Sequence, residues 1–155
     1  SSDVCSSDLA YLARAGVPDR PETLEKHNCL CVTLGDSVHD HWRFSRDGQD
    51  VTVAVRGNRV SDDGDAVRRW ALAGHGIACK SALDVADDLR AGRLLRLCPE
   101  WSGEPMPLSL VCADRRQISP VVQALRTFLA KRCAKHWPGG VERGQDADPD
   151  ASPRG

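Results

Sequence analysis

The residues that decide the fold are 60–98, which read VSDDGDAVRRWALAGHGIACKSALDVADDLRAGRLLRLC. Two sets of residues recur there at the i, i+3, i+4 and i+7 spacing of one helical face: Val67, Trp70, Ala71 and Gly74, then Ala82, Val85, Ala86 and Leu89. Short apolar runs at 76–79 and 94–98 follow the two predicted helices. This strand–helix–strand–helix–strand order predicts an α/β fold with right-handed crossovers and a mainly parallel sheet with flanking helices.

The segments on either side add further elements. Residues 20–24 have a proline at a plausible first helical position, which predicts a short helix. Residues 29–32 are apolar and predict a short strand. Asp47-Gly48 between the apolar runs 42–44 and 51–55 predicts a β-hairpin. We expect another strand at 108–113. Ser119-Pro120 then begins a long helix whose apolar face consists of Val121, Val122, Leu125, Phe128 and Leu129.

The two ends of the chain look unlike the rest. Residues 1–9, SSDVCSSDL, are a near-repeat without fold periodicity, so we expect a non-native leader that stays outside the fold. Residues 138–155 are rich in proline, glycine and charge, which predicts a disordered tail. The only methionine is Met106, which suggests a fragment of a longer protein.

Composition excludes several classes of protein. The 155 residues include 21 Lys and Arg against 22 Asp and Glu, a net charge of −1, so the chain lacks the excess of basic residues that grips a phosphate backbone. No apolar run approaches the roughly 20 residues that cross a bilayer, which argues against a membrane protein. Four Trp, one Tyr and two Phe predict a mainly aliphatic core.

The seven cysteines are predicted to be reduced thiols. The count is odd, and four of them lie within apolar runs, where a free cysteine behaves as a small hydrophobic side chain: Cys31, Cys79, Cys98 and Cys112. This usage favours a cytoplasmic protein. The alternative is a zinc site formed by Cys29 and Cys31 with His27, His39 and His41, but no second C-x-x-C pair supports it. We therefore expect no metal and no cofactor.

Two loops are candidates for ligand binding. In an open α/β sheet, ligands bind beyond the carboxyl ends of the strands, where helix N-termini converge. The loop Ser61-Asp62-Asp63-Gly64 and the loop Lys80-Ser81 both follow predicted strands. For Asp63 alone, capping of the following helix is the favoured alternative.

Catalysis has little support in the sequence. Neither a G-x-S-x-G elbow nor an H-E-x-x-H pair nor a phosphate-binding glycine loop occurs. His75 is close enough in sequence to Cys79 to suggest a base beside a nucleophile. It lies in Gly-His-Gly, however, where a turn with an exposed imidazole is the simpler interpretation. We expect the protein not to be an enzyme.

A series of motifs resembles the LysR-type transcriptional regulators. The similarity includes AYLARAGVP at 10–18, PETL at 21–24, HNCL at 27–30 and WRF at 42–44. It continues through VSDDG at 60–64 and is strongest at RWALAGHGIA (69–78) and DDLRAGRL (87–94). Residues 115–129 resemble the closing helix.

This resemblance implies a C-terminal effector-binding domain, periplasmic-binding-protein-like, with a small molecule in a cleft between two subdomains. It implies a remnant of subdomain I at 10–34, a complete subdomain II at 35–104 and a return into a partial subdomain I at 105–137. The family's cleft residues correspond to Ser61, Asp62 and Asp63. Trp42 is a further candidate for effector binding, with core packing as its alternative.

The implied partners are a small-molecule effector and further copies of the chain, as a homodimer or tetramer. DNA would be contacted only by a helix-turn-helix domain that precedes this sequence in the family. The alternative function is a fragment of a solute-binding protein of a transport system, which shares the architecture.

Overall fold

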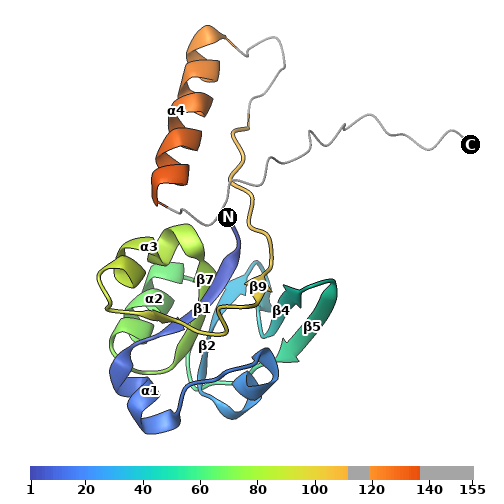
Figure 1. The fold of residues 1–155 in the computed structure, drawn as a ribbon, viewed down its shortest axis with the longest axis vertical. Coiled ribbons are helices and arrows are strands. Elements are labelled where there is room, and N and C mark those ends of the chain that lie inside the picture. Colours follow the sequence, from blue (N-terminus) through green and yellow to red (C-terminus); the bar gives the residue numbers. More distant parts are fainter. Residues whose placement is uncertain (112–118, 137–155) are drawn as a thin grey trace, which may run out of the picture.

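The computed structural model describes residues 1–111 and 119–136 (Figure 1). The first of these segments contains the strands and the shorter helices, and a single long helix occupies the second. The elements in chain order are β1 Asp3–Ser7, α1 Leu9–Ala15, the 3-10 helix η1 Pro21–Lys26, β2 Cys29–Leu34, β3 Ser37–Val38, β4 His41–Arg46, β5 Gln49–Ala54, β6 Val60–Ser61, α2 Gly64–Leu72, β7 Ile77–Ser81, α3 Ala82–Arg90, β8 Leu95–Arg96, β9 Ser102–Gly103 and α4 Pro120–His136.

The central sheet has the strand order β3-β2-β7-β1-β8, and β6 pairs with β2 outside this path. Strand β2 runs parallel to β6 and β7, whereas β1 is antiparallel to both β7 and β8. The strands linked through α2 and α3 therefore run in one direction, as predicted, and β1 is inserted among them in the opposite direction. The predicted α/β class is confirmed, but the sheet is mixed rather than mainly parallel, because β1 and β3 pair with their neighbours in antiparallel fashion.

The two faces of this sheet are covered by different elements, because side chains alternate along each strand. On one face, Val4, Leu30 and Ala78 pack against the predicted apolar sides of α2 and α3. On the other face, Cys5, Cys29 and Ile77 pack against α1, η1 and the β4–β5 hairpin. Figure 1 shows α2 and α3 on the opposite side of β1 and β7 from the hairpin.

The expectation that residues 1–9 stay outside the fold is wrong for this structure. Residues 3–7 form β1, with Val4 only 3% exposed and Cys5 only 2% exposed. The segment lacks a clear strand pattern in sequence because Cys5 serves as a small apolar side chain on one face of β1 while Val4 occupies the other. Ser7 adds a hydrogen bond of 2.8 Å from its hydroxyl to the carbonyl oxygen of Gly76, and Asp8 caps α1.

The structure also differs from the expected division at residues 34 and 35. Strand β2, which was placed in the subdomain I remnant, lies in the same sheet as β6 and β7. Its side chains Cys29 and Leu30 are buried in the two cores that the later residues complete. The predicted boundary at residues 34 and 35 separates β2 from its partner strands, because parallel pairing joins strands that are distant in sequence.

The β4–β5 hairpin is confirmed at its predicted turn. Asp47 and Gly48 have φ angles of 50° and 79°, as a two-residue turn with both central residues in the left-handed region requires. Strand β9 joins the other edge of β4 to make a second, three-stranded sheet. The predicted strand at 94–98 is shorter than expected, since only Leu95–Arg96 pair, with β1.

The C-terminal segment agrees only in part with the sequence. The long helix is confirmed as α4, but residues 108–111 adopt no regular structure, so the predicted strand at 108–113 is wrong there. Leu108 and Val111 are largely exposed, without the pairing that would order a strand. The remainder of that strand, residues 112–118 and 137 of the predicted return and the whole predicted tail lie outside the described residues.

A prediction follows from the apolar side chains that α4 leaves exposed. Phe128 is 57% exposed and Leu125 45%, and Leu110 on the preceding segment is 44% exposed, so the predicted apolar face of α4 is largely uncovered. Each such side chain forfeits about 1.5–3 kcal/mol relative to full burial. We expect the 155-residue chain to bind an apolar fluorescent dye and to self-associate in sedimentation. Replacing Leu125 and Phe128 by serine should weaken both signals, and an unchanged dye signal in that variant would contradict the prediction.

Candidate functional site

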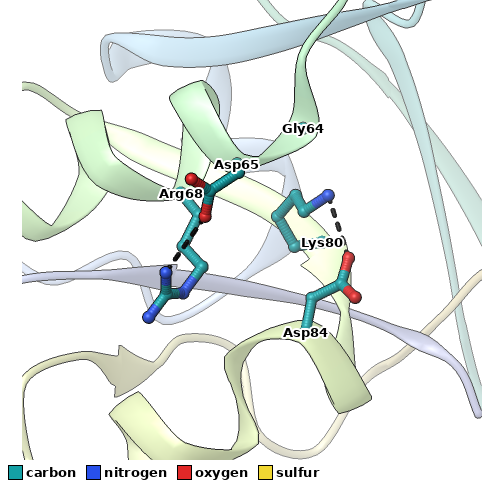
Figure 2. Close-up of a pocket in the computed structure, with 5 residues that line it drawn as sticks. All are labelled: Gly64, Asp65, Arg68, Lys80 and Asp84. Atoms are coloured by element: carbon teal, nitrogen blue, oxygen red, sulfur yellow. Dashed lines mark hydrogen bonds and ion pairs between the residues drawn. The ribbon is translucent and has the colours of Figure 1, made fainter.

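A cavity of about 220 Å³ lies where the two predicted ligand loops meet. Strand β6 leads into α2, and strand β7 leads into α3, so two helix N-termini converge at this edge of the sheet. The cavity is lined by Gly64, Asp65 and Arg68 from α2, by Lys80 from β7 and by Asp84 from α3 (Figure 2). This is the position at which α/β sheets bind ligands.

The loop before α2 is held by its own side chains. The hydroxyl of Ser61 accepts a hydrogen bond of 3.0 Å from the backbone N–H of Asp63. A carboxylate oxygen of Asp63 accepts one of 2.9 Å from the backbone N–H of Asp65, so the capping alternative for Asp63 is confirmed. Asp62 is exposed. These three predicted residues adjoin the cavity through Gly64, but their side chains do not line it.

Trp42 belongs to the core rather than to the cavity. Its side chain lies in the cluster that includes Phe44 and Val53, and the residue is only 2% exposed. Its indole Nε1–H donates a hydrogen bond of 3.1 Å to the carbonyl oxygen of His39. The proposed effector contact through Trp42 is therefore corrected in favour of packing, because the hairpin turns this side of β4 toward the sheet.

Lys80 is the most enclosed cation of the cavity. Its side chain is 15% exposed, and its Nζ lies 3.0 Å from a carboxylate oxygen of Asp84. A β-carbon on Gly64 would lie only 2.5 Å from this Nζ. Glycine at the first position of α2 therefore makes room for the ammonium group at that helix N-terminus.

Arg68 forms the opposite wall and is held by two carboxylates. Its Nε donates a hydrogen bond of 2.6 Å to Asp88, and its Nη1 donates one of 3.1 Å to Asp65. The hydrogen bond to Asp88 raises the pKa of the Arg68 guanidinium. Figure 2 shows Arg68 with Asp65 on one side and Lys80 with Asp84 on the other.

Asp88 anchors this arrangement from inside the protein. Its side chain is 1% exposed and also accepts hydrogen bonds from Arg93. Burial acts to raise the pKa of the Asp88 carboxyl, but the hydrogen bonds from Arg68 and Arg93 outweigh it and hold the pKa below its usual value. The carboxylate therefore stays ionised and fixes Arg68 between α2 and α3.

The sequence identified the loops of this site but missed most of its side chains. The sequence predicts the loop that contains Lys80 but assigns its side chain no role, and it does not indicate Asp65, Arg68 or Asp84 as site residues. Lys80 and Asp84 are four residues apart, a spacing that often indicates an ion pair across a helical turn. No comparable signal linked Arg68 to Asp88, which is 20 residues away.

A second, larger groove of about 680 Å³ lies between residues 17–22, the β4–β5 hairpin and residues 96–101. Its Arg46 is engaged by the carboxylate of Glu100 at 2.5 Å and by the ring of Trp101. Because this groove is not formed by the carboxyl ends of the parallel strands, the first cavity is the stronger candidate for a ligand.

The cysteines of the described residues are free thiols. Burial raises the pKa of Cys29 to about 12 and that of Cys98 to about 11, so both thiols are protonated at neutral pH and are weak nucleophiles. Across residues 1–111 and 119–136, no three His, Cys, Asp or Glu side chains are placed to hold a metal ion. In the same residues no helix has the length and apolar character to cross a membrane.

Comparison with known proteins settles the family. The family model described as the LysR substrate binding domain matches residues 4–134. The chain belongs to this family. The match begins within β1 and ends within α4, so it includes both loops of the cavity.

Relatives in the LysR family are bacterial transcriptional regulators. The activator TtdR of Escherichia coli K12 is 33% identical over 92 residues, which are 59% of this chain and 30% of TtdR. The regulator DmlR of the same strain is 28% identical over 135 residues, 87% of this chain and 43% of DmlR. A putative transcriptional regulator of Pseudomonas aeruginosa is 34% identical over 123 residues, 76% of this chain and 40% of the relative. The chain thus spans less than half the length of these relatives.

Solved structures of LysR-type regulators have the same fold. The regulatory domain of AphB from Vibrio vulnificus superposes with a TM-score of 0.68 at 19% identity, over 84% of this chain and 64% of that one. The regulatory domain of CrgA from Neisseria meningitidis gives 0.62 at 22% identity over the same shares. The expected periplasmic-binding-protein-like class is confirmed, and the findings support a transcription-factor family over a transport solute-binding protein.

Proposed function

We propose that this chain is the effector-sensing part of a LysR-type transcriptional regulator and that a small molecule binds in the cavity between Arg68 and Lys80. The observation that carries the proposal is the position of this cavity, at the carboxyl ends of β6 and β7 in a domain of this family. Ser61 and Asp62, on the loop that leads into the cavity, would contact the part of the effector that extends beyond Gly64.

The remaining partners follow from the family. In the parent protein a segment outside this sequence would bind DNA, and two or four copies would associate in the cytoplasm. The relatives are named as transcriptional regulators, which supports a regulatory role for this chain without catalysis.

The direct test is a ligand screen with the 155-residue chain labelled with nitrogen-15. Mixtures of small metabolites are added, and the amide resonances of Gly64, Lys80 and Asp84 report binding at the cavity. We expect at least one compound to shift these resonances in a saturable manner. A broad panel without any effect on them would contradict the proposed site.

Substitutions in the loop before α2 test the role of Ser61 and Asp62. We expect Ser61→Ala to weaken binding of the identified effector by about 0.5–1.5 kcal/mol, the usual net contribution of one hydrogen bond. Asp62→Ala should change affinity without loss of stability, since Asp62 is exposed. Calorimetric titration measures both. Affinities equal to that of the unsubstituted chain in both variants would remove these residues from the site.

A further inference from the structure

Three cysteine thiols lie in a row across the middle of the central sheet. Cys5 of β1 is paired directly with Cys79 of β7, and Figure 1 shows these two strands side by side. Strand β2 runs parallel to β7 with Cys29 opposite Ile77, and the same register brings Cys31 beside Cys79. Because partners in register point to the same face, all three side chains belong to the core on the hairpin side of the sheet.

The pairing of Cys5 with Cys79 has the geometry that a cross-strand disulfide needs. The carbonyl oxygen of Cys5 accepts a hydrogen bond of 2.8 Å from the backbone N–H of Leu97, so the polar backbone groups of Cys5 point away from β7. Cys5 and Cys79 are therefore a non-hydrogen-bonded antiparallel pair, the kind in which the Cα atoms are about 4.5 Å apart and the side chains are closest. Disulfides join residues whose Cα atoms are about 4.4–6.8 Å apart.

The two thiols differ in their access to solvent. Cys79 is half-buried, whereas Cys5 is only 2% exposed. Burial and a hydrogen bond with the Cys79 side chain raise the pKa of the Cys5 thiol well above its ordinary value, so Cys5 is protonated at neutral pH and is a weak nucleophile. A small oxidant that arrives from solvent therefore meets Cys79 first.

We propose that hydrogen peroxide converts Cys5 and Cys79 into a reversible disulfide that joins β1 to β7. The Cys79 thiolate attacks a peroxide oxygen, an S–O bond forms, the O–O bond breaks, and the departing hydroxide takes up the proton that the thiol released. The Cys5 sulfur then attacks the Cys79 sulfenic acid, an S–S bond forms, the S–O bond breaks, and a second water leaves with the Cys5 proton. The two sulfurs lose two electrons, which the peroxide gains, and thiol exchange restores both cysteines.

Cys31 is the competing partner for Cys79, and the contacts favour Cys5. The Cys5 thiol has a hydrogen bond with the Cys79 side chain, whereas the Cys31 thiol lies 3.8 Å from the carbonyl oxygen of Cys29, to which it donates. A metal ion is not the better occupant of the row, since the described part of the chain places no three His, Cys, Asp or Glu side chains to hold one. The arrangement therefore favours oxidation over coordination.

A disulfide at this position would act on the next residue, Lys80, which lines the cavity. Side chains alternate along β7, so Cys79 points to the hairpin side of the sheet while Lys80 points to the other side. Drawing Cys79 toward β1 would shift the backbone that carries Lys80. The disulfide itself does not depend on the proposed function, whereas its use as a signal to the effector site rests on it.

Mass spectrometry of the reduced 155-residue chain after treatment with hydrogen peroxide tests the bond. Trypsin separates the two thiols, with Cys5 in the peptide 1–14 and Cys79 in the peptide 70–80. We expect these two peptides to be joined with loss of two hydrogens, within a single chain on electrophoresis without reductant, and to separate after dithiothreitol. Predominant linkage of Cys79 to the peptide of Cys31, a link only between chains, or no link at all would overturn the proposal.

Three alanine variants assign the roles of the thiols. In Cys5→Ala the sulfenic acid at Cys79 lacks its partner, so we expect dimedone to trap it in several-fold higher yield than in the unsubstituted chain. In Cys79→Ala the link to Cys5 should be lost. Cys31→Ala is the matched control, because it removes a buried thiol from the same row and should leave the link intact. With folding checked by the dispersion of the amide spectrum, loss of the link in Cys31→Ala or absence of the dimedone adduct in Cys5→Ala would contradict the assignment.

Amide spectra of the reduced and oxidised chain test the signal to the cavity. We expect the resonances of Lys80 and Gly64 to shift on oxidation and to return with reductant, whereas that of Asp47 at the hairpin turn should stay in place. A disulfide that forms without moving the Lys80 resonance would overturn the signalling role and leave the proposed effector site standing. If instead no small molecule shifts the cavity resonances, the effector site fails while the disulfide stands.

Discussion

Asp88→Ala is expected to lower the free energy of unfolding by about 3 kcal/mol. The carboxylate is buried at the junction of α2 and α3 and accepts hydrogen bonds from Arg68 and Arg93. Its loss would leave two guanidinium groups without their partner. The effect stays near the lower end of the range for buried ion pairs, since the side chains of Arg68 and Arg93 are 28% and 54% exposed and can gain hydration. Urea denaturation followed by circular dichroism measures the change.

The neighbouring residue supplies the control for Asp88. Asp87 is 76% exposed and pairs with Arg90 on the surface of α3. We expect Asp87→Ala to change stability by less than about 0.5 kcal/mol, as is typical of exposed ion pairs. Similar losses in the two variants would show that the buried bonds of Asp88 are not what stabilises the α2–α3 junction.

The same carboxylate predicts a dependence of stability on pH. The pKa of Asp88 is lower in the folded protein than the ordinary value of an aspartate carboxyl. A carboxyl with a depressed folded pKa stabilises the protein above its unfolded pKa and loses that contribution as the pH falls through the folded value. The stability difference between the unsubstituted chain and Asp88→Asn should be constant from about pH 7 to 5 and should shrink below about pH 4. A constant difference down to pH 2 would contradict this.

Trp42→Ala is expected to destabilise the protein by about 3–5 kcal/mol, the usual cost of deleting a buried tryptophan side chain. Trp42 is 2% exposed and packs in the cluster on the hairpin side of the sheet. The substitution would leave a cavity and remove the hydrogen bond to the carbonyl of His39. Thermal and urea denaturation measure the loss of stability.

Two variants separate packing from ligand contact at this position. Trp42→Phe keeps most of the apolar volume and should cost clearly less than Trp42→Ala. Trp70→Ala removes a half-buried tryptophan that packs at the edge of the cluster between the sheet and α2, with Arg59 against its ring, and should also cost less. If Trp42→Ala instead left stability unchanged and altered only ligand affinity, the assignment of Trp42 to the core would be wrong.

Parts of the site were predictable because they follow from local order along the chain. The carboxyl ends of β6 and β7 could be located from the apolar runs, and this placed the loops at Ser61 and Lys80 at one edge of the sheet. The cap formed by Asp63 could be predicted for the same reason, since it joins residues two apart. The contact between Lys80 and Gly64, which are on different elements, could not.

The sequence by itself determined the elements whose signals lie within a few residues. The helical spacing of α2 and α3 and the turn at Asp47-Gly48 depend on backbone geometry over one or two turns, and the family motifs at 69–78 are equally local. Only the tertiary structure decided that β1 lies between β7 and β8, that β2 shares their sheet and that Asp88 fixes Arg68 beside the cavity. Strand pairing and buried ion pairs join residues far apart in sequence, and their free energy exists only once the other elements have excluded water around them.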